Sequence, residues 1–323
     1  MFQRGSGSIG HQRVVVFGGS GFIGRYVVKR LAATGAPVRV ACRDTEGAKF
    51  LKPMGAVGQI SLFPTNVRYP ESVAKACEGM DAIVNLVGIL SEFGPQKFHD
   101  VQAKGAAAVA KAAAEEGIER LVHVSAIGAD PESDSLYAQS KAEGEAAVHT
   151  AVPTATILRP SVVFGPEDEF FNRFAELARF LPALPLIDGG HTKMQPVYVG
   201  DVADAICKAL TDPSCAGKTY ELGGPQIMSM KEIMQYTLEQ AGMKRFLLPL
   251  PSPIAAIQAR LFELLPSPPL TRDQLKLLAH DNVVTAGAKG FDDLGIAPTP
   301  VEAVVPRYLS RFRGARTREQ AMP

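Results

Sequence analysis

Val14 to Gly24 reads Val-Val-Val-Phe-Gly-Gly-Ser-Gly-Phe-Ile-Gly. Its first four residues are apolar, as in a strand buried on both faces of a parallel sheet. Gly18, Gly21 and Gly24 follow at intervals of three, and a segment with helical periodicity comes next. A strand that turns sharply into a helix points the free N–H groups and positive dipole end of the helix at the turn, which suits a pyrophosphate. The stretch therefore favours a dinucleotide site over an ordinary turn.

The rest of the first half repeats this alternation of apolar strands and helices. Further strands are expected at residues 37–43, 59–63, 81–90, 120–125 and 154–158, with helices at 70–78 and 98–117. Strands that alternate with helices at this spacing predict a doubly wound α/β fold with a parallel sheet. A smaller, mostly helical C-terminal domain is expected to accompany it.

Changes in the pattern predict the domain boundaries. Residues 1–12 are rich in glycine and serine and are expected to form a flexible arm. The nucleotide-binding domain is expected at 13–165, with returning segments near 195–223. The smaller domain is assigned to 166–194 and 224–306, and a basic tail to 307–323.

Two features of the C-terminal half suit contact with a partner. Prolines interrupt the apolar segment 246–270, so it cannot form one helix, and its leucines predict a surface that a small domain cannot bury. The tail carries Arg307, Arg311, Arg313, Arg316 and Arg318. Such a tail suits anionic lipid headgroups or a partner protein, or else is simply solvated.

At Ser229 and Glu232 the spacing predicts a capping box that opens a helix.

Composition excludes several classes of protein. The 323 residues carry a net charge of +1, so no strong field attracts nucleic acid, and no nucleic-acid partner is expected. The four cysteines lack C-x-x-C spacing and the histidines lack metal-ligand spacing, so no metal is expected. No stretch approaches the run of about 18 apolar residues that a membrane span needs. We expect a soluble, cytoplasmic protein, which leaves docking on a membrane complex open.

Arg43 ends the second predicted strand, where the residue that contacts the adenosine ribose should lie. An acidic residue there binds the 2′-hydroxyl of NAD, whereas an arginine accommodates the 2′-phosphate of NADP. The planar guanidinium suits a phosphate, and Asp44 comes one place later. This pattern favours NADP(H) as the cofactor, against the alternative of a surface charge at a strand end.

Ser125, Tyr137 and Lys141 could perform chemistry together. Ser125 closes the fifth strand, and Tyr137 and Lys141, four residues apart, lie on one face of the next helix. A lysine ammonium lowers the pKa of a neighbouring phenol, so this tyrosine could exchange a proton with a carbinol oxygen that the serine holds. Tyr-x-x-x-Lys alone is common and usually structural, and the nucleotide-binding context is what makes this pair a catalytic candidate.

These motifs resemble the short-chain dehydrogenase/reductase superfamily. The resemblance rests on Gly18-x-x-Gly21-x-x-Gly24, Asn85-Leu-Val-Gly88, Ser125, Tyr137-x-x-x-Lys141 and Arg159-Pro160, the last typical of its extended, epimerase-like branch. Phe164 replaces that branch's tyrosine, and Asn66 replaces a frequent aspartate beside the adenine. The resemblance implies contacts with the dinucleotide from Gly18, Ser20, Gly21, Phe22, Ile23, Gly24, Arg43, Asn66, Val87, Gly88, Tyr137, Lys141 and Pro160.

A narrower likeness covers nearly the whole chain. Segments including Leu51-Lys-Pro-Met-Gly55, Gln195-Pro-Val-Tyr-Val199 and Leu270-Thr-Arg-Asp-Gln274 resemble the nucleotide-binding accessory subunits of respiratory complex I (NADH:ubiquinone oxidoreductase) and their bacterial relatives. This implies a tightly held NADPH with a structural role at the junction of the peripheral and membrane arms. It also implies a peripheral position on the inner face of an energy-transducing membrane, the matrix side in mitochondria.

Two functions from different classes remain open. One is a structural or assembly subunit that binds NADPH, contacts other complex I subunits and carries Ser125, Tyr137 and Lys141 as vestigial residues. The other is a free-standing NADP-dependent reductase or epimerase acting on a small carbonyl or nucleotide-sugar-like substrate. The apolar, proline-broken segment favours the subunit, and the three intact residues favour the enzyme.

Overall fold

The computed structural model describes residues 9–265 and 268–313. The chain divides into two compact units. Unit 1 comprises Met1–Pro160, Gly200–Glu221 and Gly287–Ile296, and unit 2 comprises Ser161–Val199, Leu222–Ala286 and Ala297–Pro323. The segment 287–296, expected in the smaller domain, clusters with unit 1 because the Glu221 N–H donates to the Lys289 carbonyl at 2.8 Å. Among the described residues, no helix is long and apolar enough to cross a membrane.

A seven-stranded sheet forms the centre of unit 1. Its spatial order is β11-β6-β5-β4-β1-β2-β3. The strands are β1 (Val14–Phe17), β2 (Val38–Cys42), β3 (Ile60–Pro64), β4 (Ala82–Asn85), β5 (Leu121–Val124), β6 (Thr156–Pro160) and β11 (Thr219–Leu222). The pairs β1–β2, β2–β3, β1–β4, β4–β5 and β5–β6 are parallel. The strand order reverses between β1 and β4, which is where ligands bind in open α/β sheets, and the predicted doubly wound fold is confirmed.

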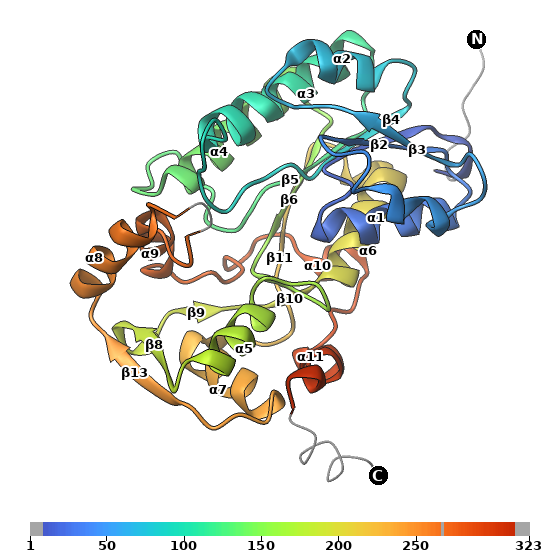
Figure 1. The fold of residues 1–323 in the computed structure, drawn as a ribbon. Coiled ribbons are helices and arrows are strands. Elements are labelled where there is room, and N and C mark those ends of the chain that lie inside the picture. The colour runs from blue at the N-terminus through green and yellow to red at the C-terminus, as the bar shows by residue number, and fades with distance from the viewer. Residues whose placement is uncertain (1–8, 266–267, 314–323) are drawn as a thin grey trace, which may run out of the picture. The chain divides into compact units, whose positions relative to one another are not determined.

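Helices cover both faces of this sheet (Figure 1). On one face lie α2 (Pro70–Cys77), α3 (Lys104–Glu115) and α4 (Leu136–Ala151), and on the other lie α1 (Phe22–Ala33) and α6 (Val199–Thr211). All four residues of β1 are buried, as their unbroken apolar run predicts. Arg30 of α1 donates to Asp204 of α6 at 3.1 Å, which links these two helices.

Two elements differ from the expected ranges in a way that shapes the site. The strand expected at 81–90 ends at Asn85, because the Asn85 carboxamide accepts the Val87 N–H at 3.2 Å and turns the chain out of the ladder. The helix expected at 98–117 begins as a π-helical turn, His99–Ala103, before α3. Residues 86–98 are therefore an irregular segment at the carboxyl edge of the sheet.

Described residues near both ends of the chain form helical structure where an arm and a tail are expected. Ile9–His11 forms a helical turn with Ile9 buried, and Gln12 accepts a hydrogen bond from Arg120 at 2.8 Å. Arg307 lies in α11 (Val301–Leu309), so the folded unit continues beyond the expected start of the tail. Residues 1–8 of the expected arm, and Arg316 and Arg318 of the tail, lie outside the described residues.

Unit 2 combines helices with short strand pairs. Its helices are α5 (Phe171–Phe180), α7 (Met230–Gln240), α8 (Ser252–Phe262), α9 (Arg272–Leu278) and α11. Three two-stranded pairs accompany them: β7 (Val163–Phe164) with β10 (Val197–Tyr198), β9 (Lys193–Met194) with β12 (Met228–Ser229), and β8 (Ala183–Ile187) with β13 (Phe246–Leu250). The predicted capping box opens α7, and the proline-rich segment breaks into β13 and α8 as expected.

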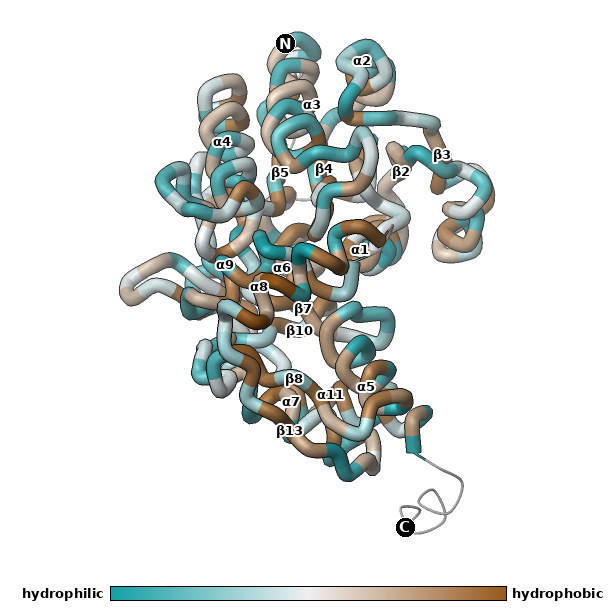
Figure 2. The backbone as a smooth tube through the Cα atoms, turned by 60° about the vertical axis from the view of Figure 1, so that its left-hand side comes forward, coloured by the Kyte–Doolittle hydropathy of each residue, from teal (hydrophilic) through white to brown (hydrophobic). Residues whose placement is uncertain are grey.

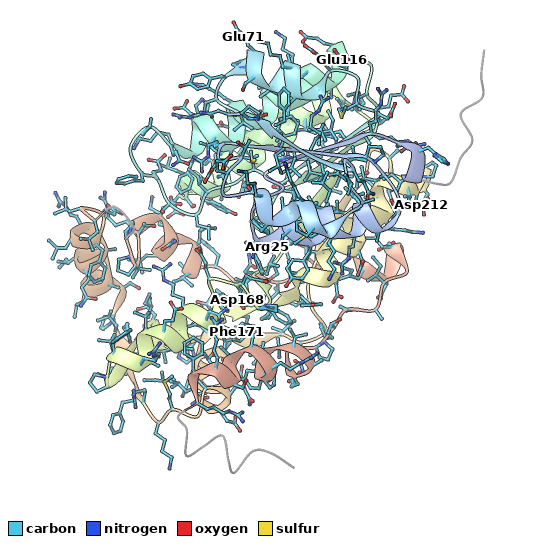
Figure 3. All side chains as sticks on the ribbon, turned by 45° about the vertical axis from the view of Figure 1, so that its right-hand side comes forward. Arg25, Glu71, Glu116, Asp168, Phe171 and Asp212 are labelled. Atoms are coloured by element: carbon cyan, nitrogen blue, oxygen red, sulfur yellow. The ribbon has the colours of Figure 1, made fainter. Side chains whose placement is uncertain are left out.

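Asp168 connects the start of α5 to the C-terminal helix of unit 2. Its buried carboxylate accepts the Tyr308 hydroxyl at 2.6 Å and the backbone N–H groups of Gly165, Phe170 and Asn172 at 3.0–3.1 Å. Asp168 and Phe171 lie together on this unit in Figure 3, and Phe171 is fully buried. A buried carboxylate with this many donors is a structural anchor, because each donor offsets the cost of removing the charge from water.

Candidate dinucleotide-binding site

The turn between β1 and α1 has the backbone geometry that an anion site needs. Gly18 adopts φ +75°, and a Cβ there would lie 3.3 Å from the Leu86 carbonyl carbon. Gly21 is the N-cap of α1, and the first turn of that helix contains no acidic residue. The positive end of the helix dipole is therefore not neutralised by a local carboxylate.

Gly24 has a different role in the same turn. A Cβ on Gly24 would lie 2.4 Å from the Gly18 carbonyl oxygen, so this glycine lets the helix pack directly on the turn. A Cβ on Gly21 would meet only the Gly18 oxygen, at 3.2 Å. Gly21 therefore leaves space in front of the helix N-terminus, whereas Gly24 lets the first turn of the helix pack against the Gly18–Gly19 backbone.

A cavity of about 220 Å³ opens at this turn, entirely within unit 1. It lies between the carboxyl ends of β1, β2, β3 and β4, at the reversal of strand order. Its lining residues are Phe17, Gly18, Ser20, Gly21, Ala41, Cys42, Arg43, Thr65, Asn66, Val67, Arg68, Leu86, Val87, Gly88, Ile89, Gln96 and Val101. Of the expected cofactor contacts, the cavity brings together Gly18, Ser20, Gly21, Arg43, Asn66, Val87 and Gly88. Phe22, Ile23, Gly24, Tyr137, Lys141 and Pro160 do not line it.

Arg43 and Asp44 behave differently at the end of β2. Arg43 lines the cavity, and its guanidinium donates to the Gln96 side-chain oxygen at 2.5 Å. The Asp44 carboxylate accepts the Gly47 N–H at 2.9 Å, within its own loop. The guanidinium is therefore the charged group that the β2 end contributes to the cavity.

Lys141 lies close to the cavity wall without lining it. A Cβ on Gly88 would lie 3.3 Å from the Lys141 Nζ, and this ammonium group donates to the Val124 carbonyl at 3.4 Å. Burial lowers the pKa of Lys141 to about 8, although Glu145 opposes the shift. The Nζ is 5.8 Å from the centre of the Tyr137 ring, which itself makes an edge contact with Phe98.

Ser125 follows β5 directly and is buried, next in the chain to Val124, whose carbonyl accepts the Lys141 hydrogen bond. Among the described residues, its hydroxyl oxygen has no hydrogen-bond partner. An unpaired buried hydroxyl costs free energy, so a ligand oxygen at this position would satisfy it. Ser125, Tyr137 and Lys141 thus come from the end of β5 and from one face of α4.

Arg159 of the Arg-Pro motif is a structural residue in this arrangement. Its guanidinium donates twice to the Glu145 carboxylate, at 2.9 and 2.6 Å, and lies 3.6 Å from Glu221. Hydrogen bonding to Glu145 raises the Arg159 pKa. The Arg159–Glu145 ion pair joins β6 to α4, one helical turn beyond Lys141. Pro160 contributes its carbonyl, which accepts the Ile127 N–H at 3.0 Å.

Several residues that support the cavity wall belong to no sequence motif. Gln102 accepts the Ile89 N–H at 3.2 Å and donates to the Ser140 hydroxyl at 2.8 Å. His123 pairs with Asn85 at 3.1 Å in the middle of the sheet, and burial lowers its pKa to about 3, so it is neutral. Arg68, two residues after Asn66, and Gln96 also line the cavity, and neither belongs to a recognisable motif.

The residues present fit a dinucleotide. The glycine turn, the free helix N-terminus, Arg43 and the unpaired Ser125 hydroxyl all suit phosphate or hydroxyl groups. Within 9–265 and 268–313, no cluster of three or more histidine, cysteine or carboxylate side chains could hold a metal ion.

Comparisons with known proteins agree with this fold. Residues 14–223 match the NAD dependent epimerase/dehydratase family. The chain is 36% identical to NADH dehydrogenase [ubiquinone] 1 alpha subcomplex subunit 9 of Mus musculus, over 97% of this chain and 83% of that protein. It is 32% identical to the NADH-ubiquinone oxidoreductase 40 kDa subunit of Neurospora crassa, over 96% and 82%.

A solved structure shares the fold. DesIV, a dTDP-glucose 4,6-dehydratase from Streptomyces venezuelae, superposes with a TM-score of 0.71 at 22% identity, covering 94% of this chain and 98% of that one. The chain therefore belongs to the NAD dependent epimerase/dehydratase family and, within it, to the family of these NADH:ubiquinone oxidoreductase subunits.

Proposed function

We propose that this protein is an NADP(H)-binding accessory subunit of respiratory complex I, with a structural or assembly role near the membrane. The observation that carries the proposal is the likeness to subunit 9, which extends over 97% of the chain and so includes unit 2. Proteins of different function can share the fold of both units, as DesIV does at 22% identity, so the support for a shared role is the 36% sequence identity sustained through unit 2.

NADP(H) is the proposed cofactor because of the charges at the end of β2. Arg43 lines the cavity, and the Asp44 carboxylate is bound to its own loop. A 2′-phosphate would gain charge-assisted hydrogen bonds from Arg43, whereas a 2′-hydroxyl would find no carboxylate lining this cavity. When bound, the nicotinamide would supply hydride chemistry, and Gly18, Ser20 and Gly21 would hold the pyrophosphate.

Unit 2 offers a surface for docking, formed by β13 and α8. Helix α8 packs inward through Ala255 and Ala259, which are fully buried, and exposes Ile254, Ile257 and Leu261 by 50, 66 and 62%. A surface helix usually turns its large apolar residues inward, whereas α8 turns them outward. Hydrophobic residues, coloured brown, lie along parts of this segment in Figure 2, as they do in several other elements.

The β13–α8 surface suits other complex I subunits at the membrane. Phe246 and Leu248 of β13 are also exposed, by 77 and 56%. Lys244 and Arg260 are exposed on the same stretch of chain and suit lipid phosphates. We propose that this surface is buried in the assembled complex, peripheral to the membrane and at the arm junction.

The test is co-purification of the native protein with complex I in mild detergent. Tyr137→Phe should leave assembly and NADH:quinone turnover nearly unchanged, because it keeps the ring against Phe98. A double variant, Ile257→Asp with Leu261→Asp, should fold but fail to co-purify. A protein that runs alone, with complex I intact in its absence, would refute the subunit function.

Two observations favour a second function, that of an NADP-dependent carbonyl reductase. The Ser125 hydroxyl is buried without a partner among the described residues, and the lowered pKa of Lys141 is typical of functional sites. In that case Ser125 would hold the carbonyl oxygen and Tyr137 would donate the proton. Tyr137→Phe would then reduce NADPH oxidation against a carbonyl panel by about 10²–10⁴-fold.

A further inference from the structure

A small turn, Phe93–Gln96, contributes Gln96 to the lining of the nucleotide cavity. Phe93 and Gln96 exchange backbone hydrogen bonds of 3.2 and 3.0 Å, and Gly94 between them adopts φ +53°. The Glu92 carboxylate accepts the Phe98 N–H at 2.8 Å and closes the base of the turn. The segment is therefore a compact structure of its own within the irregular stretch after β4.

Two arginines hold this turn against the cavity. Arg43 donates to the Gln96 side-chain oxygen at 2.5 Å, and Arg68 donates to the Pro95 carbonyl at 2.9 Å. Pro95 and Gln96 are consecutive, with Cα atoms about 3.8 Å apart, so both guanidiniums reach the same few atoms. They arrive from the ends of β2 and β3, which are neighbouring parallel strands. Arg43, Arg68 and Gln96 all line the cavity.

Both acceptors on the turn are neutral oxygens. A phosphate monoester carries a charge near −2 and binds arginine more strongly than an amide or carbonyl oxygen does. A phosphate that reaches this corner therefore competes with the turn for both guanidiniums. The Asn66 side chain, which accepts the Arg68 N–H and Nε at 3.1 and 3.4 Å, keeps Arg68 at the cavity.

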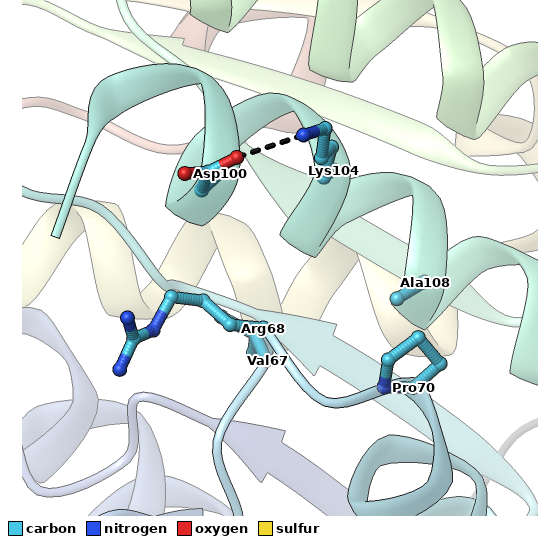
Figure 4. A pocket seen from close by; sticks show the side chains of 6 residues that line it. All are labelled: Val67, Arg68, Pro70, Asp100, Lys104 and Ala108. Atoms are coloured by element: carbon cyan, nitrogen blue, oxygen red, sulfur yellow. Dashed lines mark hydrogen bonds and ion pairs between the residues drawn. The ribbon is translucent and has the colours of Figure 1, made fainter. Parts of the chain in front are cut away.

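A nearby lysine provides a contrast with Arg68. Lys104 shares a neighbouring cavity of about 320 Å³ with Arg68 but forms an ion pair with Asp100 at 2.9 Å (Figure 4). No dashed line joins Arg68 to that pair in Figure 4, although its charge is a minor cause of the lowered Asp100 pKa, and its guanidinium donates to Asn66 and Pro95. Of these two cations, Arg68 is the one placed to serve the nucleotide cavity.

We propose that Arg68 is a second residue that recognises the 2′-phosphate, and that the Phe93–Gln96 turn is a strap that this phosphate releases. The proposal rests on the proposed NADP(H) binding at Arg43. On phosphate binding, Arg43 and Arg68 transfer hydrogen bonds from Gln96 and Pro95 to phosphate oxygens. The strap then loosens, so its conformation depends on whether the bound cofactor carries a 2′-phosphate. A partner that contacts this part of the surface of unit 1 would encounter that difference.

Dissociation constants for NADPH and NADH test Arg68 directly. Nucleotide fluorescence is a clean signal because the chain has no tryptophan. Arg68→Gln should weaken NADPH about tenfold, the loss of one charge-assisted hydrogen bond, and leave NADH within about twofold. Lys104→Gln, the matched control, removes one nearby charge and should change neither. Equal weakening of both cofactors by Arg68→Gln would show a merely structural arginine and overturn the proposal.

Hydrogen exchange of the unaltered full-length protein tests the strap without a mutation. Adenosine 2′-monophosphate should speed exchange at the Phe93, Gln96 and Phe98 amides, and adenosine 5′-monophosphate should not. An identical response to the two nucleotides would refute the strap. If Arg43→Gln abolishes the NADPH preference and Arg68→Gln keeps it, only this inference fails. If the unaltered protein shows no preference, the proposed cofactor fails.

Discussion

Gly21→Val separates cofactor binding from folding. The substitution is compatible with the backbone, because Gly21 has φ −75°, and the added Cβ meets only the Gly18 oxygen at 3.2 Å. The rest of the side chain enters the space in front of the α1 N-terminus, where the pyrophosphate is expected. We therefore expect a folded protein that no longer responds to NADPH.

The magnitude follows from binding linkage. A ligand that binds only the folded state stabilises it by RT ln(1 + [L]/Kd), or about 2.7 kcal/mol at 100 times Kd. For domains of about 150–250 residues, each kcal/mol shifts Tm by about 2–4 °C. NADPH should therefore raise the Tm of the unaltered protein by about 5–11 °C and leave that of Gly21→Val unchanged.

Circular dichroism melts with and without NADPH measure this shift. Gly24→Val is the contrasting variant, because its Cβ would lie 2.4 Å from the Gly18 oxygen and 2.6 Å from Gly19. Such overpacking costs about 1–3 kcal/mol, so its Tm should fall even without nucleotide. An undiminished NADPH response in Gly21→Val would show that the pyrophosphate site lies elsewhere.

Three further outcomes are expected. Tyr308→Phe should lower the free energy of unfolding by about 1–3 kcal/mol in urea titrations, because the buried Asp168 carboxylate loses a donor at 2.6 Å; an unchanged midpoint would contradict the anchor. The folded-state pKa of His123, about 3, lies below its ordinary 6.5, so the unfolded chain binds the extra proton between these values and stability falls as the pH drops through this window. That loss is about 2 kcal/mol between pH 6.5 and 5, and His123→Gln should reduce it. Ile257→Asp should leave Tm within about 1 °C, since this side chain is 66% exposed, yet reduce recovery of the protein with membranes; equal recovery would argue against the β13–α8 surface.

The local sequence was sufficient to predict the strand and the turn with which the site begins. The apolar run Val14–Phe17 and the glycines after it specify a buried strand and a tight turn, because burial and backbone freedom act within a few residues. The capping box at Ser229 and the shared helix face of Tyr137 and Lys141 are equally local, since both follow from helical spacing. The parallel sheet followed from the alternation of strands and helices along the chain.

Tertiary packing decided which of these residues share a site. Arg43 meets Gln96, and Arg159 meets Glu145, only because separate strand ends and helices converge at one edge of the sheet. No local pattern encodes such a meeting, since it depends on strand order and on where β4 ends. Burial of Lys141 and exposure of Ile257 were likewise decided by neighbouring elements, because the same helical spacing serves a face turned inward or outward. The sequence by itself determined the nucleotide turn, and the packed structure decided which charges stand around it.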